Sequence, residues 1–336
     1  MAAISLGDMG QSYLLRSRNH GLKTTLSRLA QEVSTGQVAD PTERLSGHFS
    51  YLSQIERDRM LVDARTIATK EVTIASSAMQ SALERVGDAA DGLVQSLSLS
   101  ATTTGDTSLS IVTANARGQL ENMVAALNVN VAGRHLFSGV DVEAAPLADT
   151  ETLLNELRTA LSGATSQADL MAAADAFFDT PGGPFETMIY TGSTTNLAPV
   201  QLGAGESVSL DIRADDQGLR DLLKHVAVTA LADDPGLSIS DTGRQELPGQ
   251  LLGGLLGAKD NLVLLRANLG FAEERLERVS SRLEAEDTTL QLARNTLLEA
   301  DPFDAASELE AVRLQIETLY TVTARTARLS LVNFLS

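Results

Sequence analysis

The sequence lacks cysteine and tryptophan altogether, and aromatic residues make up only 4% of its 336 positions. Without cysteine, a disulfide bond, a thiolate nucleophile and a cysteine-ligated metal are all excluded. Compact enzyme cores usually rely on aromatic rings for buried area, whereas helical seams built from leucine, valine and alanine do not need them. The shortage of aromatic residues therefore favours long, packed helices over a compact catalytic core.

Positive charge is scarce as well, and the deficit is concentrated in the middle of the chain. The formal net charge is −18, and residues 137–260 hold 19 acidic but only 6 basic residues. Proteins that bind nucleic acid need clustered lysine and arginine, and so do proteins that adsorb to anionic lipid. We therefore expect no nucleic-acid partner and no membrane partner, and we interpret the acidic middle as a solvated outer surface.

Long hydrophobic runs are also missing. No stretch approaches the roughly 20 apolar residues that a membrane-spanning helix requires. The first residues, Met1 to Asp8, show no basic segment followed by an apolar one, so we expect no cleavable secretory signal. By these signs the protein is cytoplasmic or leaves the cell by a route that reads no such signal.

What the sequence does contain is apolar residues spaced alternately by three and four positions, the pattern of a coiled-coil seam. In the C-terminal half the seam comprises Leu262, Leu265, Leu269, Ala272, Leu276, Val279, Leu283, Leu290 and Leu297. In the N-terminal half a comparable stripe comprises Val72, Met79, Leu83, Val86, Ala90, Leu93 and Leu97. These stripes predict long helices on both sides of the middle segment.

Helix-stopping and helix-starting residues mark the ends of the outermost helices. Gly36 follows the last seam residue of the first helix, and Asp301 with Pro302 forms an N-cap and first-turn pair for the last one. Apolar and polar residues alternate strictly from Ser207 to Arg213, which is typical of a half-buried strand. The predicted helices cover about 10–34, 51–100, 107–131, 151–178, 219–231, 246–300 and the segment after Pro302, and the predicted strands cover 187–190 and 207–213.

Together these elements predict a mainly α fold. It consists of a long antiparallel helical coiled coil or bundle formed by the N- and C-terminal segments, with a small α+β domain inserted in the middle. The expected divisions are an N-terminal assembly helix at 1–40, the long helical domain at 41–139 and 246–300, the inserted variable domain at 140–245, and a C-terminal assembly helix at 301–336.

A search for catalytic or ligand-binding patterns finds none. The four histidines are scattered without metal-ligand spacing, at positions His20, His48, His135 and His225. The pair of glycines at Gly203 and Gly205 lacks the third glycine of a dinucleotide fingerprint and is interpreted as a turn. The acidic pairs Asp215-Asp216 and Asp233-Asp234 are likewise interpreted as turns. We therefore expect neither an enzyme nor a cofactor or metal.

The two outermost helices carry more apolar residues than a solitary pair of helices can use. Breaks at Asp40-Pro41 and Asp301-Pro302 separate them from the long helices. Two helices of roughly 25–30 residues are marginal in water by themselves, whereas each further buried leucine or valine contributes about 1.5–3 kcal/mol. We therefore predict an interface between subunits that comprises Leu22, Leu26, Leu29, Val33, Leu309, Val312, Ile316, Leu319, Leu331, Val332, Phe334 and Leu335.

Four segments of the chain carry motifs that can be compared with a known family. They are residues Leu29 to Gln37, the pattern Gly-x-x-Leu-Phe-Ser-Gly within Asn128 to Gly139, residues 300–309, and the ending at 330–335. These segments resemble the flagellin-like family of bacterial flagellar proteins, and in particular the hook–filament junction proteins (hook-associated protein 3). The first is similar to the segment that follows the first helix in this family, the second to the turn after the third helix, and the last two to the C-terminal helix and its ending. The resemblance covers about residues 1–140 and 246–336.

The resemblance implies a structural subunit of the bacterial flagellum that joins hook to filament. It also implies unfolded export through the flagellar type III channel without a cleaved signal, and terminal helices that become ordered in the inner tube. The implied partners are other copies of the chain, neighbouring hook-associated protein and flagellin subunits, and an export chaperone that holds the C-terminal part beforehand. Flagellin itself, the bulk filament subunit, is one alternative, and a cytoplasmic coiled-coil binding module is another.

Overall fold

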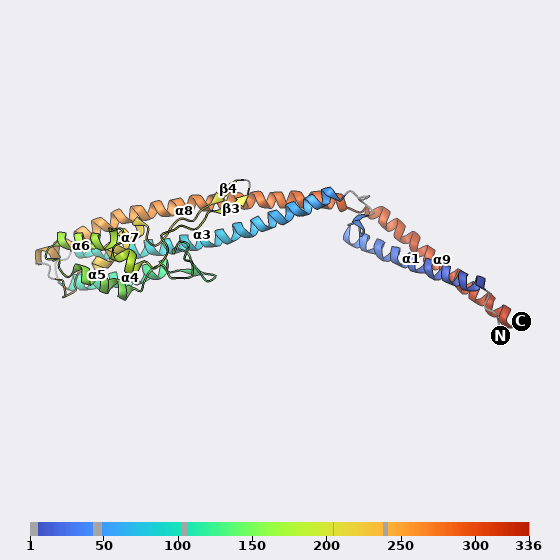
Figure 1. Ribbon diagram of the computed structural model, residues 1–336, viewed down its shortest axis with the longest axis horizontal. Helices are drawn as coiled ribbons and strands as arrows, with labels where there is room; N and C mark the ends of the chain where they lie inside the picture. Colours follow the sequence, from blue (N-terminus) through green and yellow to red (C-terminus); the bar gives the residue numbers. More distant parts are fainter. Residues whose placement is uncertain (1–5, 43–48, 103–105, 204, 238–240, 336) are drawn as a thin grey trace. The chain divides into compact units, whose positions relative to one another are not determined.

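The computed structural model describes residues 6–42, 49–102, 106–203, 205–237 and 241–335. The chain divides into two compact units (Figure 1). The terminal unit comprises Met1–Asp63 and Glu284–Ser336, and the central unit comprises Ala64–Leu283. Two long helices, α3 (Ser50–Thr102) and α8 (Asp241–Leu298), contribute residues to both units.

Helices account for most of the fold, as the sequence predicts. The others are α1 (Leu6–Thr35), α4 (Asp106–Leu127), α5 (Thr150–Leu161), α6 (Gln167–Asp179), α7 (Gln217–Leu231) and α9 (Pro302–Leu335), with a short π-helix η1 (Phe185–Ile189). The strands form two small antiparallel hairpins, β1 (Asn130–Val131) with β2 (Arg134–His135), and β3 (Val200–Gly203) with β4 (Glu206–Val208). A mainly α architecture with a small α+β segment in the middle is therefore confirmed.

In the central unit, α3 and α8 pack through the predicted heptad seams. The α3 seam residues Met79, Leu83, Val86, Ala90, Leu93 and Leu97 are buried, and so are Leu262, Leu269, Leu276, Val279 and Leu283 of α8. A Cβ atom on Gly87 would lie 3.5 Å from the side chain of Leu262, and Lys259 forms an ion pair with Asp91. Heptad spacing buries the same face of each helix along its length, which is why the pattern in the sequence is reliable here.

The middle segment shares this core instead of standing apart from it. α7 packs against α4 as well as against α5 and α6. Phe178 lies between Phe177 and Phe185, with ring centroids 5.1 Å and 5.3 Å away, and all three rings are buried in one core with α3, α4 and α8. The predicted five-part division of the chain stays a prediction.

Local structure in the middle segment differs from the sequence-based expectation at two places. The strand expected at 187–190 is wrong, because Phe185–Ile189 forms a π-helical turn in which Tyr190 N donates to Phe185 O at 2.8 Å. Phe185 and Ile189 are both buried, so the apolar spacing there is helical. The strand expected at 207–213 ends at Val208, because its partner β3 is only four residues long.

Two predicted helices also differ from the expectation, one by an interruption and one by an earlier end. The helix expected at 151–178 is interrupted, because Ser166 caps α6 in a reciprocal capping box with Asp169. The helix expected to reach 131 ends at Leu127, because the Asn128 side-chain amide pairs with the backbone N–H and C=O of Leu147, both at 2.9 Å.

The Gly-x-x-Leu-Phe-Ser-Gly pattern fastens two loops to the core. Phe137 is fully buried, and its carbonyl accepts from Ala214 N at 2.9 Å, while the Ser138 carbonyl accepts from Ser193 N at 2.8 Å. Gly139 has φ +63°, and a Cβ there would lie 2.5 Å from the carbonyl oxygens of Ser193 and Thr195. Only glycine fits this position, so the pattern has a structural reason.

Candidate assembly interface

The first and last helices, α1 and α9, pack against each other in the terminal unit (Figure 1). Each helix has a clear boundary at the point where the pair begins. α1 ends at Thr35, and the next residue, Gly36, has φ +67° and donates its N–H to Glu32 O at 2.8 Å. α9 begins with Pro302, and the Asp301 carboxylate accepts from Phe303 N at 2.8 Å and Asp304 N at 3.3 Å. The predicted end of the first helix at Gly36 and the predicted start of the last helix at Asp301 and Pro302 are therefore confirmed.

Backbone pairing between the two connecting segments fixes the register of the pair. Val38 N donates to Leu298 O at 2.9 Å, and Ala300 N donates to Gly36 O at 3.1 Å. These two bonds flank an antiparallel bridge between Gln37 and Glu299. Residues 260 positions apart in the sequence are thus held together by main-chain contacts.

A buried carboxylate supports the same junction. The side chain of Glu32 is almost fully buried, and its Oε1 accepts from Arg28 Nη1 at 2.9 Å and from Ala39 N at 3.1 Å. Both donors compensate for the loss of hydration, which an unpaired buried carboxylate could not tolerate. Glu32 therefore ties the end of α1 to the segment that follows it. The sequence analysis did not single out this residue, and no motif marks it.

The predicted seam residues do come together, but the seam is thin. Leu29 and Val312 are buried, with 1% and 8% of their surface exposed, and Val33 is 39% exposed. The remaining described members are half-buried: Leu22, Leu26, Leu309, Ile316 and Leu319. The side chains of Leu331, Val332, Phe334 and Leu335 lie outside the described residues. The function of the seam as a contact between subunits stays a prediction.

Large apolar side chains cover other faces of the same pair. Phe303 is 78% exposed and Leu314 is 65% exposed, and Tyr13 and Leu14 of α1 are exposed to a similar degree. They lie off the three-and-four spacing, so seam-based sequence analysis missed them. Exposed apolar side chains are therefore present on the pair outside the predicted seam.

A tyrosine links the two helices further along. Hydrogen bonds from Asn19 and Lys23 of α1 to the Tyr320 hydroxyl on α9 lower the pKa of Tyr320 from its usual value of 10.0. Both bonds lie on the surface of the pair, where water competes for the same groups. They orient α9 against α1 without adding a buried core.

The most densely charged cluster of the central unit is an internal contact. The ammonium group of Lys224 on α7 is nearly buried and lies 2.8 Å from Asp175 and 2.7 Å from Asp179. Burial alone would lower the pKa of Lys224, but hydrogen bonds to these carboxylates outweigh it and raise the pKa above 10.5. All partners are satisfied within the protein, so the cluster stabilises the packing of α6 on α7.

The histidines do not gather into a site. In the described part of the chain, no three His, Asp or Glu side chains lie close enough together to hold a metal ion. Burial lowers the pKa of His225, whose ring packs so closely on α8 that a Cβ on Gly254 would overlap it. His48 lies outside the described residues. Across the described helices, none has the length and apolar character that crossing a membrane would need.

Comparisons with known proteins relate this architecture to flagellar proteins. Residues 254–335 match the family model described as the bacterial flagellin C-terminal helical region. No curated protein matches the sequence at a significant level.

One solved structure resembles the fold at a TM-score above 0.5. A crystal structure of Bacillus cereus FlgL aligns with a TM-score of 0.52 at 14% identity, over 72% of this chain and 98% of that one. A protein described as flagellar hook-associated from Vibrio parahaemolyticus aligns with a TM-score of 0.44 at 12% identity, over 74% of this chain and 92% of the other. The matched family region spans most of α8 and α9, including the half of the candidate interface that α9 supplies. The chain is therefore flagellin-like in its C-terminal helical region, within a fold shared with FlgL.

Proposed function

We propose that this protein is a structural subunit of the bacterial flagellum, the adaptor between hook and filament, and that it works by assembly and not by catalysis. The observation that carries the proposal is the pairing of α1 with α9. This pair joins the two ends of the chain, buries few side chains of its own and exposes large apolar ones. Its α9 half lies in the region that matches the flagellin C-terminal family.

In the proposed mechanism, the α1–α9 pair of one subunit packs against the α1–α9 pairs of neighbouring subunits. Half-buried seam residues such as Leu26 and Ile316, with exposed residues such as Leu314, become buried between neighbouring subunits. Each leucine that moves from water into such a contact contributes about 1.5–3 kcal/mol. Several of them per subunit outweigh the cost of ordering two helices. Neighbouring hook-associated protein and flagellin subunits extend the same kind of contact at either side of the junction.

The proposed route to the site of assembly is export through the flagellar type III channel. A chain without cysteine cannot cross-link itself while it is unfolded. Before export, a chaperone covers the apolar C-terminal part, which otherwise exposes surface prone to aggregation. Once assembled, the protein lies outside the cell, and this placement separates the proposal from a cytoplasmic coiled-coil module.

Truncation of α9 tests the proposal. Deleting residues 305–336 removes one helix of the pair and no residue of the central unit, so we expect a folded, soluble monomer that cannot enter the flagellum. The measurements are circular dichroism of the purified protein, and its detection in sheared flagella of cells that lack the native gene. Loss of the whole fold on truncation would show that α9 is ordinary core and would overturn the proposal.

A point variant gives a finer test. Leu314→Asp places a charge on an exposed apolar position of α9, so the monomer should keep its stability while assembly into sheared flagella is lost. Thr318→Asp, at an exposed polar position one turn away, is the matched control and should assemble. Purified protein should stay monomeric or form short oligomers. Spontaneous growth of long filaments would identify it as flagellin instead.

A further inference from the structure

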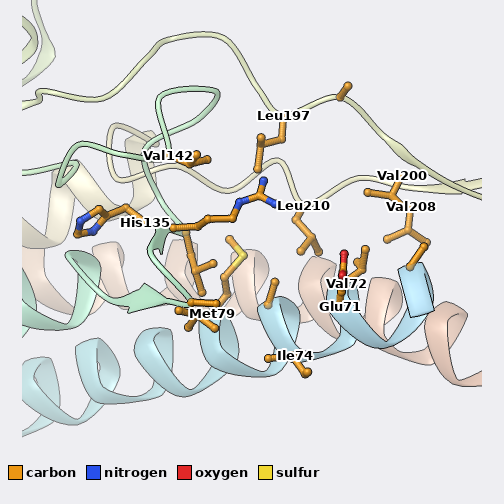
Figure 2. A pocket seen from close by; sticks show the side chains of 17 residues that line it. Glu71, Val72, Ile74, Met79, His135, Val142, Leu197, Val200, Val208 and Leu210 are labelled. Carbon is orange, nitrogen blue, oxygen red and sulfur yellow. The ribbon is translucent and has the colours of Figure 1, made fainter. Parts of the chain in front are cut away.

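An apolar groove in the central unit lies outside the proposed assembly helices. It has a volume of about 370 Å³ and opens between α3, the β1–β2 hairpin and the segments 197–200 and 208–210. Figure 2 shows Val72 and Met79 on α3 facing Leu197, Val208 and Leu210 on the opposite side. Most of the lining is aliphatic. A groove of this size, open to solvent, has room for several apolar side chains of a partner.

The polar groups of the groove include one cation without a partner. Arg134 lines the groove and is exposed, and among the described residues its side chain has no ion pair or hydrogen bond. His135 directs Nδ1 to Asn128 O at 3.0 Å, so its ring is held in place, and Glu71 supplies a carboxylate on the α3 side.

The same unit carries an apolar stripe on the outer face of α8. It comprises Leu256, Val263, Leu264 and Phe271, which are between 47% and 68% exposed. The stripe lies opposite the buried seam residues Leu262 and Leu269, and its spacing of seven or eight residues keeps it on one face over roughly 22 Å. An intramolecular core leaves such a face polar, so the stripe calls for an external partner.

An unpaired carboxylate lies within this stripe. Asp260 is one turn from Leu256 and one turn from Leu264, and among the described residues its side chain has no ion pair or hydrogen bond. The groove therefore offers apolar lining with the cation of Arg134 and the carboxylate of Glu71, and the stripe offers apolar side chains with the carboxylate of Asp260. The two surfaces match in their apolar character, and Asp260 is of the right charge to pair with Arg134.

We propose that the α8 stripe of one copy docks into the groove of the next copy, with Asp260 of one chain beside Arg134 of the other. Groove and stripe are different surfaces of one unit, so the contact is head-to-tail and repeats from copy to copy. A ring or tube of subunits needs such a contact. The inference rests on the proposed function, which it deepens by naming a second contact between the same subunits.

Disulfide trapping in full-length chains tests the contact, because the protein has no cysteine of its own. One chain carries Ala198→Cys in the groove lining. Another, with a different affinity tag, carries Ala267→Cys beside the stripe, one helical turn from Leu264 and from Phe271. Both positions are exposed, and both leave Arg134 and Asp260 in place. Mixed at high concentration and oxidised, the pair should yield about tenfold more mixed dimer than Ala125→Cys, an exposed α4 control, yields with Ala267→Cys.

Charge reversal tests the proposed ion pair in the same assay. Arg134→Asp in the groove chain, or Asp260→Arg in the stripe chain, should each reduce the mixed dimer to the level of the control. Combining the two reversed chains should restore it. Equal yields in all combinations would overturn the contact, and so would trapping that occurs mainly between two Ala267→Cys chains, which would indicate a symmetric stripe-to-stripe dimer.

Failure of this inference can be told apart from failure of the proposed function. If no mixed dimer forms although the full chain still enters sheared flagella and the 305–336 deletion does not, the groove contact is wrong and the adaptor function stands. If the mixed dimer forms but the deletion variant still assembles, the groove contact stands and the role of the α1–α9 pair is wrong.

Discussion

The central unit and the α1–α9 pair are built from the same helical patterns, but they differ in how fully their apolar residues are buried. In the central unit, seam leucines and four phenylalanines are fully enclosed by neighbouring elements. In the pair, Leu29, Ala305 and Val312 are the buried apolar residues among the side chains described for α1 and α9. Two helices can bury only the stripe between them, whereas a third and fourth element enclose a core. The difference shows that the pair has a much smaller apolar core of its own than the central unit.

The largest loss of stability should come from a substitution in the aromatic cluster of the central unit. Phe178→Ala removes a fully buried ring that contacts Phe177 and Phe185, so we expect the free energy of unfolding of this unit to fall by about 3–5 kcal/mol. Chemical denaturation followed by circular dichroism measures it. Phe303→Ala, which removes an exposed ring from α9, is the control and should change stability by less than about 0.5 kcal/mol.

The next largest loss of stability should come from Gly139, in the pattern that holds two loops against the core. Gly139→Ala should destabilise the central unit by about 2–4 kcal/mol, because the added methyl group meets two carbonyl oxygens at a positive φ. Gly133 also has a positive φ, of +83°, but it has open space around it. Gly133→Ala should therefore cost only about 1 kcal/mol. Equal losses for both variants would mean that backbone strain, and not crowding, makes glycine necessary at Gly139.

A smaller and local effect is expected in the terminal unit. Leu29→Ala removes the most buried apolar side chain of the α1–α9 pair, so opening of the pair should become easier by about 2 kcal/mol. Amide hydrogen exchange measures it: α1 and α9 should exchange faster while the amides of α4 and α7 stay unchanged. Leu14→Ala, at an exposed position of α1, should leave exchange as it is. Faster exchange throughout the chain would contradict the view that the two units are stabilised separately.

Most of the helical framework could be predicted from the sequence, because its signals are local or strictly periodic. The heptad seams of α3 and α8 identify their buried faces, Gly36 ends α1, and Asp301 with Pro302 starts α9. The pairing of the two chain ends also followed from their matching stripes. These features depend only on the packing of one apolar helix face against another, and a helix presents the same face every seven residues.

The middle segment was harder to predict, because its elements are short and depend on their neighbours. The π-helical turn at 185–189 follows from burial of Phe185 and Ile189 against surrounding helices. The end of α4 depends on Asn128 meeting Leu147, nineteen residues away. At the interface, the exposure of Phe303 and Leu314 became visible only once α1 was seen to cover a different face of α9.

By itself, then, the sequence determined most of the helices, their buried stripes and the matching apolar stripes at the two ends of the chain, because repeating contacts leave a repeating pattern. Only the tertiary structure decided which apolar surfaces were already used within one molecule. Leu262 and Phe271 are both apolar residues of α8, yet one is buried against α3 and the other faces solvent. That distinction depends on the positions of other elements in space, and no local pattern records it.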